Sequence, residues 1–139
     1  MQPKRIDPLK RERELREHRA LAQSRILILE QRPRWTPELQ RQMLDQNVRV
    51  RSCASARELS SVLADDPRAV VVLDLAAGTG ECLQFLRSLP DVEGTPAIVA
   101  IASPETKDLE WPARELGASA FLVDPVSGDD LAQFCRRQL

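Results

Sequence analysis

The chain has 139 residues, which is enough for one domain with a buried core. Its 20 Lys and Arg residues nearly balance its 21 Asp and Glu residues, so no strong net field favours nucleic acid or a membrane surface as a partner. With three cysteines, no Cys-x-x-Cys pair and one histidine, a zinc centre or a disulfide framework is not expected.

Residues 1–24 differ in composition from the rest of the chain and predict a charged helical extension. Residues 10–19 are almost all charged, and opposite charges recur four positions apart, as in Lys10 and Glu14. The leucines of this segment do not repeat in heptads, so an independent coiled coil is not supported. Two interpretations stay open, a solvated helix and a docking or dimerisation arm.

From residue 25 onward, short apolar runs alternate with amphipathic segments that begin with helix-capping residues. In the first half, Thr36 followed by Pro37 predicts one helix start, and the capping box from Ser55 to Glu58 predicts another. The strands expected in this half comprise residues 25–30, 48–51 and 69–74. The third of these is apolar throughout, as in a strand that is buried on both faces.

The second half continues the alternation. We expect a helix around residues 83–89, strands at 96–101 and 120–123, and a last helix capped by Ser127. A helix start at Ser103 is interrupted or displaced by Pro112. Five strands alternating with helices predict an α/β fold with a parallel sheet and helices on both faces.

The central strand ends at Asp74, and small residues including Gly78 and Gly80 follow it. We expect residues 75–80 to form a loop, because glycines permit tight turns and close backbone approach. In open α/β sheets, functional groups gather where the carboxyl ends of the strands meet such loops. Asp74 is therefore the first candidate for a functional residue, although it could simply cap the loop.

Residues 25–139 resemble response-regulator receiver domains over their whole length. The resemblance rests on an acid after the first strand, an acid ending the third, and motifs further along the chain: Glu30, Asp74, Leu83-Gln84-Phe85-Leu86-Arg87, Pro96, Gly117-Ala118 and Phe121-Leu122-Val123-Asp124-Pro125. It implies a doubly wound five-stranded parallel sheet with the flavodoxin-like strand order 2-1-3-4-5. Residues 25–139 would be the receiver-like domain, and residues 1–24 its extension.

A second resemblance is local. The stretch from Leu73 to Glu81 looks like the first motif of Rossmann-like methyltransferases, which bind S-adenosylmethionine. That family needs an acid at the end of the next strand to bind the ribose hydroxyls, and this position falls on Ile101. It also needs more strands than the remaining sequence supplies. We therefore favour the receiver.

The receiver resemblance implies roles for several residues. Asp74 stands at the phosphoacceptor position, and the candidate Mg²⁺ ligands are Glu30, Asp74 and the backbone carbonyl of Ala76. Gln31 stands where the family has the second acid of its metal-binding pair. The metal set is therefore incomplete.

The switch positions are more strongly altered. Ile101 stands where the family has Thr or Ser, unless a two-residue slip brings Ser103 there; Phe121 keeps the aromatic position. Asp124 replaces the Lys that neutralises the phosphoryl group, which reverses the charge. Carboxylates that converge at one site disfavour joint ionisation. A shared proton, an arginine such as Arg32, or a divalent cation could each relieve this.

We therefore expect a stand-alone receiver-like signalling and interaction module of a bacterial two-component or phosphorelay pathway, acting without phosphorylation as a pseudo-receiver. One alternative is a phosphorylatable receiver that uses Asp74 at an atypical site. A methyltransferase fragment is the other. We expect no enzyme activity and no resident cofactor, with Mg²⁺ left open.

We expect protein partners, including a second copy of the chain, and neither nucleic acid nor membrane. The expected interaction surface includes Leu109, Trp111 and Phe134, because receivers often use this half of the domain. By default, Trp111 and Trp35 are expected to be partly buried under helix ends. No apolar run approaches a membrane span and no signal-peptide core follows Met1, so a cytoplasmic location is expected.

Overall fold

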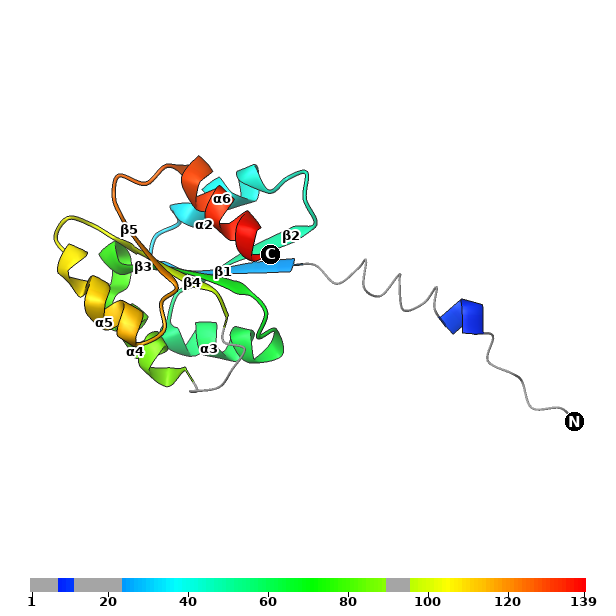
Figure 1. The fold of residues 1–139 in the computed structure, drawn as a ribbon, viewed down its shortest axis with the longest axis horizontal. Helices are drawn as coiled ribbons and strands as arrows, with labels where there is room; N and C mark the ends of the chain where they lie inside the picture. Colours follow the sequence, from blue (N-terminus) through cyan, green and yellow to red (C-terminus); the bar gives the residue numbers. More distant parts are fainter. Residues whose placement is uncertain (1–7, 12–23, 90–95) are drawn as a thin grey trace, which may run out of the picture.

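The computed structural model describes residues 8–11, 24–89 and 96–139. Within these ranges five strands form one parallel sheet in the order β2-β1-β3-β4-β5 (Figure 1). The predicted α/β fold and strand order are confirmed. The strands are β1 (Ser24–Leu29), β2 (Val48–Cys53), β3 (Val70–Asp74), β4 (Ile98–Ala102) and β5 (Ala120–Val123).

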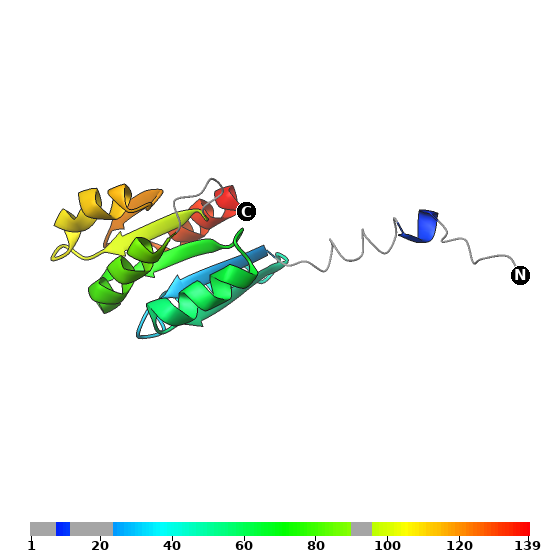
Figure 2. The ribbon, with the colours of Figure 1, turned by 90° about the horizontal axis from the view of Figure 1, so that it is seen from below.

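Helices cover both faces of this sheet. In Figure 1, α2 and α6 lie above the sheet and α3, α4 and α5 lie below it, and Figure 2 shows the latter three side by side. The helices are α2 (Trp35–Gln42), α3 (Ala56–Asp65), α4 (Leu75–Ser88), the short 3₁₀ helix η1 (Lys107–Leu109), α5 (Glu110–Glu115) and α6 (Gly128–Gln138).

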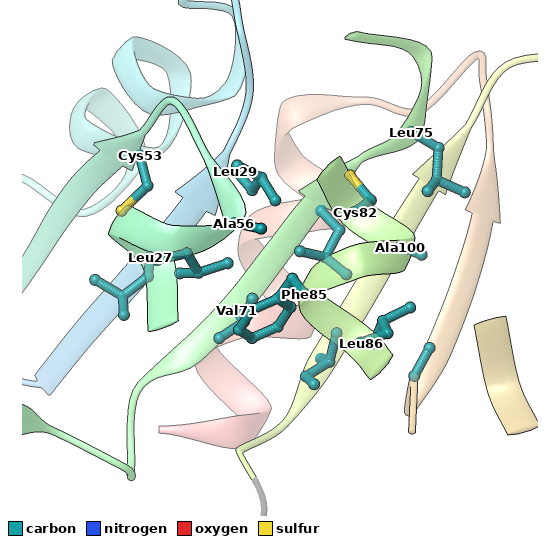
Figure 3. Close-up of a cluster of buried hydrophobic side chains, with 14 of the residues drawn as sticks. Leu27, Leu29, Cys53, Ala56, Val71, Leu75, Cys82, Phe85, Leu86 and Ala100 are labelled. Atoms are coloured by element: carbon teal, nitrogen blue, oxygen red, sulfur yellow. The ribbon is translucent and has the colours of Figure 1, made fainter. Parts of the chain in front are cut away.

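The central strand β3 joins the two halves of the core. All five of its residues are buried, and alternate side chains enter opposite clusters because successive residues of a strand point to opposite faces. Val71 packs with Phe85 of α4 in the cluster under α3, α4 and α5 (Figure 3). Val72 packs in the other cluster, under α2 and α6. The carboxylate at the end of β3 is therefore carried on a rigid support.

The segment after Asp74 corrects a prediction from the sequence. Residues 75–80 are not an open loop, because helical backbone begins at Leu75 and resumes after a kink at Gly78, which itself has extended geometry. The Asp74 side chain accepts a hydrogen bond from the backbone N–H of Ala76, which caps the helix. The alanines in this segment favour helix, whereas Gly78 interrupts it with a kink.

The region around Pro112 follows the prediction. A turn after Ser103 leads into η1, and α5 begins only at Glu110, so Pro112 lies in the first turn of that helix. Proline is tolerated there because the first N–H groups of a helix have no partner within it. The displaced helix start is thereby confirmed.

Of the expected extension, residues 8–11 form one helical turn, and the other positions before residue 24 lie outside the described residues. Among the helices that the structure describes, none combines the length and apolar character needed to cross a membrane.

Candidate functional site

Three carboxylates lie at or just beyond the carboxyl ends of the strands. Asp74 ends β3, Glu30 follows β1 and Asp124 follows β5. Since all five strands are parallel, these ends meet at one edge of the sheet. The fold therefore brings together the three acids that the sequence singled out, and their contacts differ.

Asp74 is almost fully buried, with 3% of its surface exposed. Its Oδ1 accepts the N–H of Ala76 at 3.2 Å. Burial raises the pKa of this carboxyl, the nearby Arg34 guanidinium acts in the opposite direction, and the charges of Glu30 and Asp124 add to the rise. Asp74 is thus a desolvated acid whose ionised form is favoured by the Arg34 guanidinium and by the Ala76 N–H.

Glu30 is equally buried, yet its carboxylate does not face an open site. One oxygen accepts the backbone N–H groups of Arg34 at 3.1 Å and Trp35 at 2.9 Å. The other accepts the N–H of Thr36 at 3.2 Å and also the Thr36 hydroxyl. Both oxygens therefore cap the start of α2.

This capping corrects a second prediction from the sequence. Thr36 does not open the helix as its N-cap, because α2 begins one residue earlier and Arg34, at the N-cap position, makes no side-chain cap. The negative charge of Glu30 is instead placed at the positive end of the α2 dipole. The cap comes from five residues before the helix start.

Gln31, at the second position of the acidic pair, lies against the break in α4. A Cβ atom placed on Gly78 would be 3.3 Å from Nε2 of Gln31, so this side chain packs closely on the bare backbone. The hollow between the ends of β1 and β3 has no room for a water molecule. Its lining comprises Leu29, Glu30, Gln31, Asp74, Gly78, Glu81 and Cys82.

Asp124 is paired with Arg34. The guanidinium donates two hydrogen bonds to the two carboxylate oxygens, at 2.8 and 2.9 Å. Asp124 also accepts the N–H of Val126 at 3.1 Å. The hydrogen bonds from Arg34 hold the pKa of Asp124 below its usual range, and Asp124 raises the pKa of Arg34. The charge reversal at the end of β5 is therefore compensated within the chain.

Sequence reasoning missed Arg34 and named Arg32 as the arginine that could intervene. Arg34 is separated from Asp124 by 90 residues, and its guanidinium carbon lies 4.2 Å from the centroid of the Trp35 ring. The aromatic residue next to Arg34 was a usable signal, because guanidinium groups stack on indole rings. Which arginine reaches β5 depends on the path of the turn after β1.

The switch positions lie in the core. Ile101 is fully buried in β4 and is in register with Asp74 on β3 and Leu122 on β5, so no two-residue slip occurs. Ser103 lies beyond the strand, where its hydroxyl contacts that of Thr106 at 3.3 Å. Phe121 is buried in the same cluster as Phe85. No hydroxyl therefore occupies the Ile101 position beside Asp74.

Mg²⁺, which the receiver resemblance implies, requires several hard oxygen ligands. Both oxygens of Glu30 are used by α2, Asp124 is used by Arg34, and Gln31 is a neutral amide. The backbone N–H of Ala76 donates to Asp74, so the one group of Ala76 that could bind a metal ion is its backbone carbonyl. In the described part of the chain, no three His, Cys, Asp or Glu residues are placed to hold a metal. The donor set does not fit Mg²⁺.

The residues expected on an interaction surface differ in how exposed they are in the structure. Trp111 is 70% exposed, so its expected partial burial is wrong. Trp35 is buried, and its Nε1 has no hydrogen-bond partner within the part of the chain that the structure describes. Leu109 and Phe134 are half-buried against the two opposite core clusters. Of the three proposed surface residues, Trp111 is therefore the one whose side chain is mostly exposed to solvent.

No protein-family model matches the sequence, and no curated protein matches it in sequence either. Solved structures do match in three dimensions. The chemotaxis response regulator CheY4 of Vibrio cholerae superposes with a TM-score of 0.66 at 17% identity, covering 85% of this chain and 100% of that one. The receiver domain of a LuxO repressor protein from Vibrio parahaemolyticus gives 0.70 at 16% identity, covering 84% and 89%. A sensor protein from Polaromonas sp. JS666 gives 0.65 at 24% identity, covering 83% and 94%. These likenesses show the fold.

Proposed function

We propose that this chain, which has the fold of response-regulator receiver domains, is a signalling module that acts through protein contacts without phosphorylation of Asp74. The observation that carries the proposal is the pairing of Arg34 with Asp124 at the edge where a receiver needs an unpaired cation. It is a proposal about a binding module, with no enzyme activity of its own.

The charges at the strand ends support this proposal. Phosphoryl transfer to an acid depends on cations that neutralise the incoming oxygens. Here Arg34, whose positive charge acts on Asp74, already makes two hydrogen bonds to Asp124. An incoming phosphoryl group that drew Arg34 away would leave the Asp124 carboxylate uncompensated, and unit charges about 4 Å apart repel by about 4 kcal/mol at an effective dielectric constant of about 20. Ile101 offers no hydroxyl to retain the group.

The test is direct. The full chain is incubated with Mg²⁺ and acetyl phosphate, and its intact mass is measured before and after. We expect no adduct. A stoichiometric phosphate adduct that is absent from the Asp74→Asn variant would overturn the proposal. A receiver with a complete acidic pair and a strand-five Lys, treated in parallel, serves as the control for the donor.

The second candidate is a phosphorylatable receiver with an altered site. It is favoured by the position of Asp74 at the end of the central strand and by the guanidinium nearby. In that case Arg34 would leave Asp124 and bind the phosphoryl oxygens. The same mass measurement decides, with Arg34→Met expected to abolish the adduct under this candidate.

The methyltransferase alternative is disfavoured. Glu81 of the glycine motif accepts the N–H of Ala56 at 2.6 Å, so it ties α4 to the start of α3. Gln31 packs against Gly78 where a cofactor would have to approach. Calorimetry with S-adenosylmethionine is expected to show no binding.

We propose a protein partner for such a module, in a cytoplasmic two-component or phosphorelay setting; the division into an extension and a domain stays a prediction, and β1 already begins at Ser24. Trp111 on α5 and Val123 at the exposed edge strand β5 are both solvent-accessible apolar side chains. Tryptophan is often a main contributor to binding energy at interfaces. We expect Trp111→Ala to weaken partner binding or self-association, measured by sedimentation of the full chain and by cross-linking.

A further inference from the structure

The strand-end edge holds three carboxylates and one guanidinium within electrostatic reach of one another. Arg34 is bonded to Asp124, and its positive charge also acts on Asp74 and Glu30. Both of those acids are buried, so the interaction is screened less than one between surface charges. The arrangement is a local cation surrounded by acids, as in a metal site, but the cation belongs to the chain.

Arg34 is also held in place from several sides. Its own backbone N–H is bonded to Glu30 at 3.1 Å, its guanidinium carbon lies 4.2 Å from the ring centroid of Trp35, and its two terminal nitrogens bind Asp124. Bidentate geometry and stacking on an aromatic ring restrict a side chain that is otherwise long and mobile. A position fixed in this way differs from that of an ordinary surface arginine.

Arg32 provides the contrast within the same turn. It is exposed, and no hydrogen bond or ion pair is found for its side chain among the described residues. Two arginines separated by one residue thus have different roles, and only Arg34 turns toward the acids.

We infer that Arg34 is the resident cation of this site and takes the electrostatic place of a divalent metal ion, so that the chain excludes Mg²⁺ and Mn²⁺ there. The guanidinium compensates Asp124 and Asp74, and the remaining acid is used by α2. This inference deepens the proposed function, because a site that carries its own cation has no position for the metal that assists phosphoryl transfer.

The test measures divalent binding on the full chain. Mn²⁺ is titrated while free Mn²⁺ is followed by electron paramagnetic resonance, and thermal midpoints are recorded with Mn²⁺ and with NaCl of equal ionic strength. For the wild type we expect no saturable binding at millimolar Mn²⁺ and equal midpoints in the two salts. For Arg34→Met, which keeps a long apolar stem, we expect a gain of at least about tenfold in Mn²⁺ affinity and a higher midpoint in Mn²⁺ than in NaCl.

Three variants make the test specific. Arg32→Met is the matched control and should behave as wild type. Arg34→Lys retains the charge and should continue to exclude the metal, and Arg34→Met combined with Asp74→Asn should lose most of the gain. Saturable Mn²⁺ binding by the wild type, or a folded Arg34→Met variant with no gain, would overturn the inference.

Failure of this inference and failure of the proposed function give different results. Wild-type Mn²⁺ binding without a phosphate adduct overturns the cation assignment alone. A phosphate adduct on Asp74 without Mn²⁺ binding overturns the phosphorylation-independent function and leaves the assignment of Arg34 intact.

Discussion

The ends of β1 and β5 both carry a carboxylate at the same edge of the sheet, and the protein compensates the two charges differently. At the end of β1, Glu30 is buried and is stabilised by uncharged donors, the backbone N–H groups of α2 and the Thr36 hydroxyl. At the end of β5, Asp124 has 18% of its side chain exposed and is neutralised by the guanidinium of Arg34, whose side chain is 48% exposed. The cost of removing each compensation should differ accordingly.

The difference arises from the element that comes after each strand. Five residues after Glu30 a helix begins, and its unpaired N–H groups supply donors at the point where the carboxylate lies. After Asp124 the chain turns through Pro125 before α6, which has its own cap in Ser127. The charge of Asp124 is compensated instead by Arg34, which follows β1 on the other side of β3 and β4. The role of a carboxylate at a strand end is therefore set by the element that follows the strand.

The largest effect is expected for Glu30→Ala. The variant leaves buried N–H groups at the start of α2 and the Thr36 hydroxyl without their acceptor, which should lower the free energy of unfolding by about 3 kcal/mol. Urea denaturation measures it. Glu110→Ala, which breaks an exposed pair with Arg114, is the matched control and should cost less than about 1 kcal/mol. Equal losses in the two variants would contradict the capping role.

A smaller loss is expected for the Arg34–Asp124 pair. A double-mutant cycle with Arg34→Met and Asp124→Asn should give a coupling of about 1 kcal/mol, because nearly half of the Arg34 side chain is exposed and screened by solvent. The pair lowers the pKa of Asp124 in the folded state, so its contribution is present above the unfolded value of about 3.9 and is lost as pH falls below it. A coupling that does not change between neutral and acidic pH would contradict the ion pair.

Asp74→Asn is expected to stabilise the protein at neutral pH by up to about 1 kcal/mol. Burial raises the folded-state pKa of Asp74, so its ionisation costs stability as pH rises through the interval between the unfolded and folded values. The gain should therefore vanish in acid, where the carboxyl is protonated in both states. Thermal unfolding of wild type and variant across this pH range measures the gain, and a destabilised variant at pH 7 would show that the carboxylate is needed as a cap.

The smallest effect is expected for Arg32→Met. Because no interaction of its side chain is described, the free energy of unfolding should change by less than about 0.5 kcal/mol. Urea denaturation beside Arg34→Met makes the comparison. A loss equal to that of Arg34→Met would mean that the two arginines share the role that we assign to one.

Much of the fold could be predicted from local patterns. The run from Val70 to Leu73 reads as a strand buried on both faces, and Ser55 with Glu58 and Ser127 mark helix starts that the structure contains. These features depend on residues close together in the chain, through side-chain periodicity and capping hydrogen bonds. Their physical causes are visible in the sequence itself.

The candidate site could be predicted only as a set of positions. The acids Glu30, Asp74 and Asp124 were placed together at one edge by the parallel order of the strands. Their partners were not, because Arg34 and Asp124 are separated by 90 residues. Similarly, the exposure of Trp111 depends on how α5 lies over its neighbours, and its residue type alone favours partial burial.

By itself the sequence determined the alternation of strands and helices, the sheet edge at which Asp74 lies, and the presence of Asp124 and Ile101 where the receiver resemblance implies a cation and a hydroxyl. Only the tertiary structure decided that Glu30 caps α2 and that Arg34, not Arg32, compensates Asp124. The reason is that the direction of a side chain beyond a turn is set by the three-dimensional path of the backbone, and the partner of Arg34 lies 90 residues away in the chain.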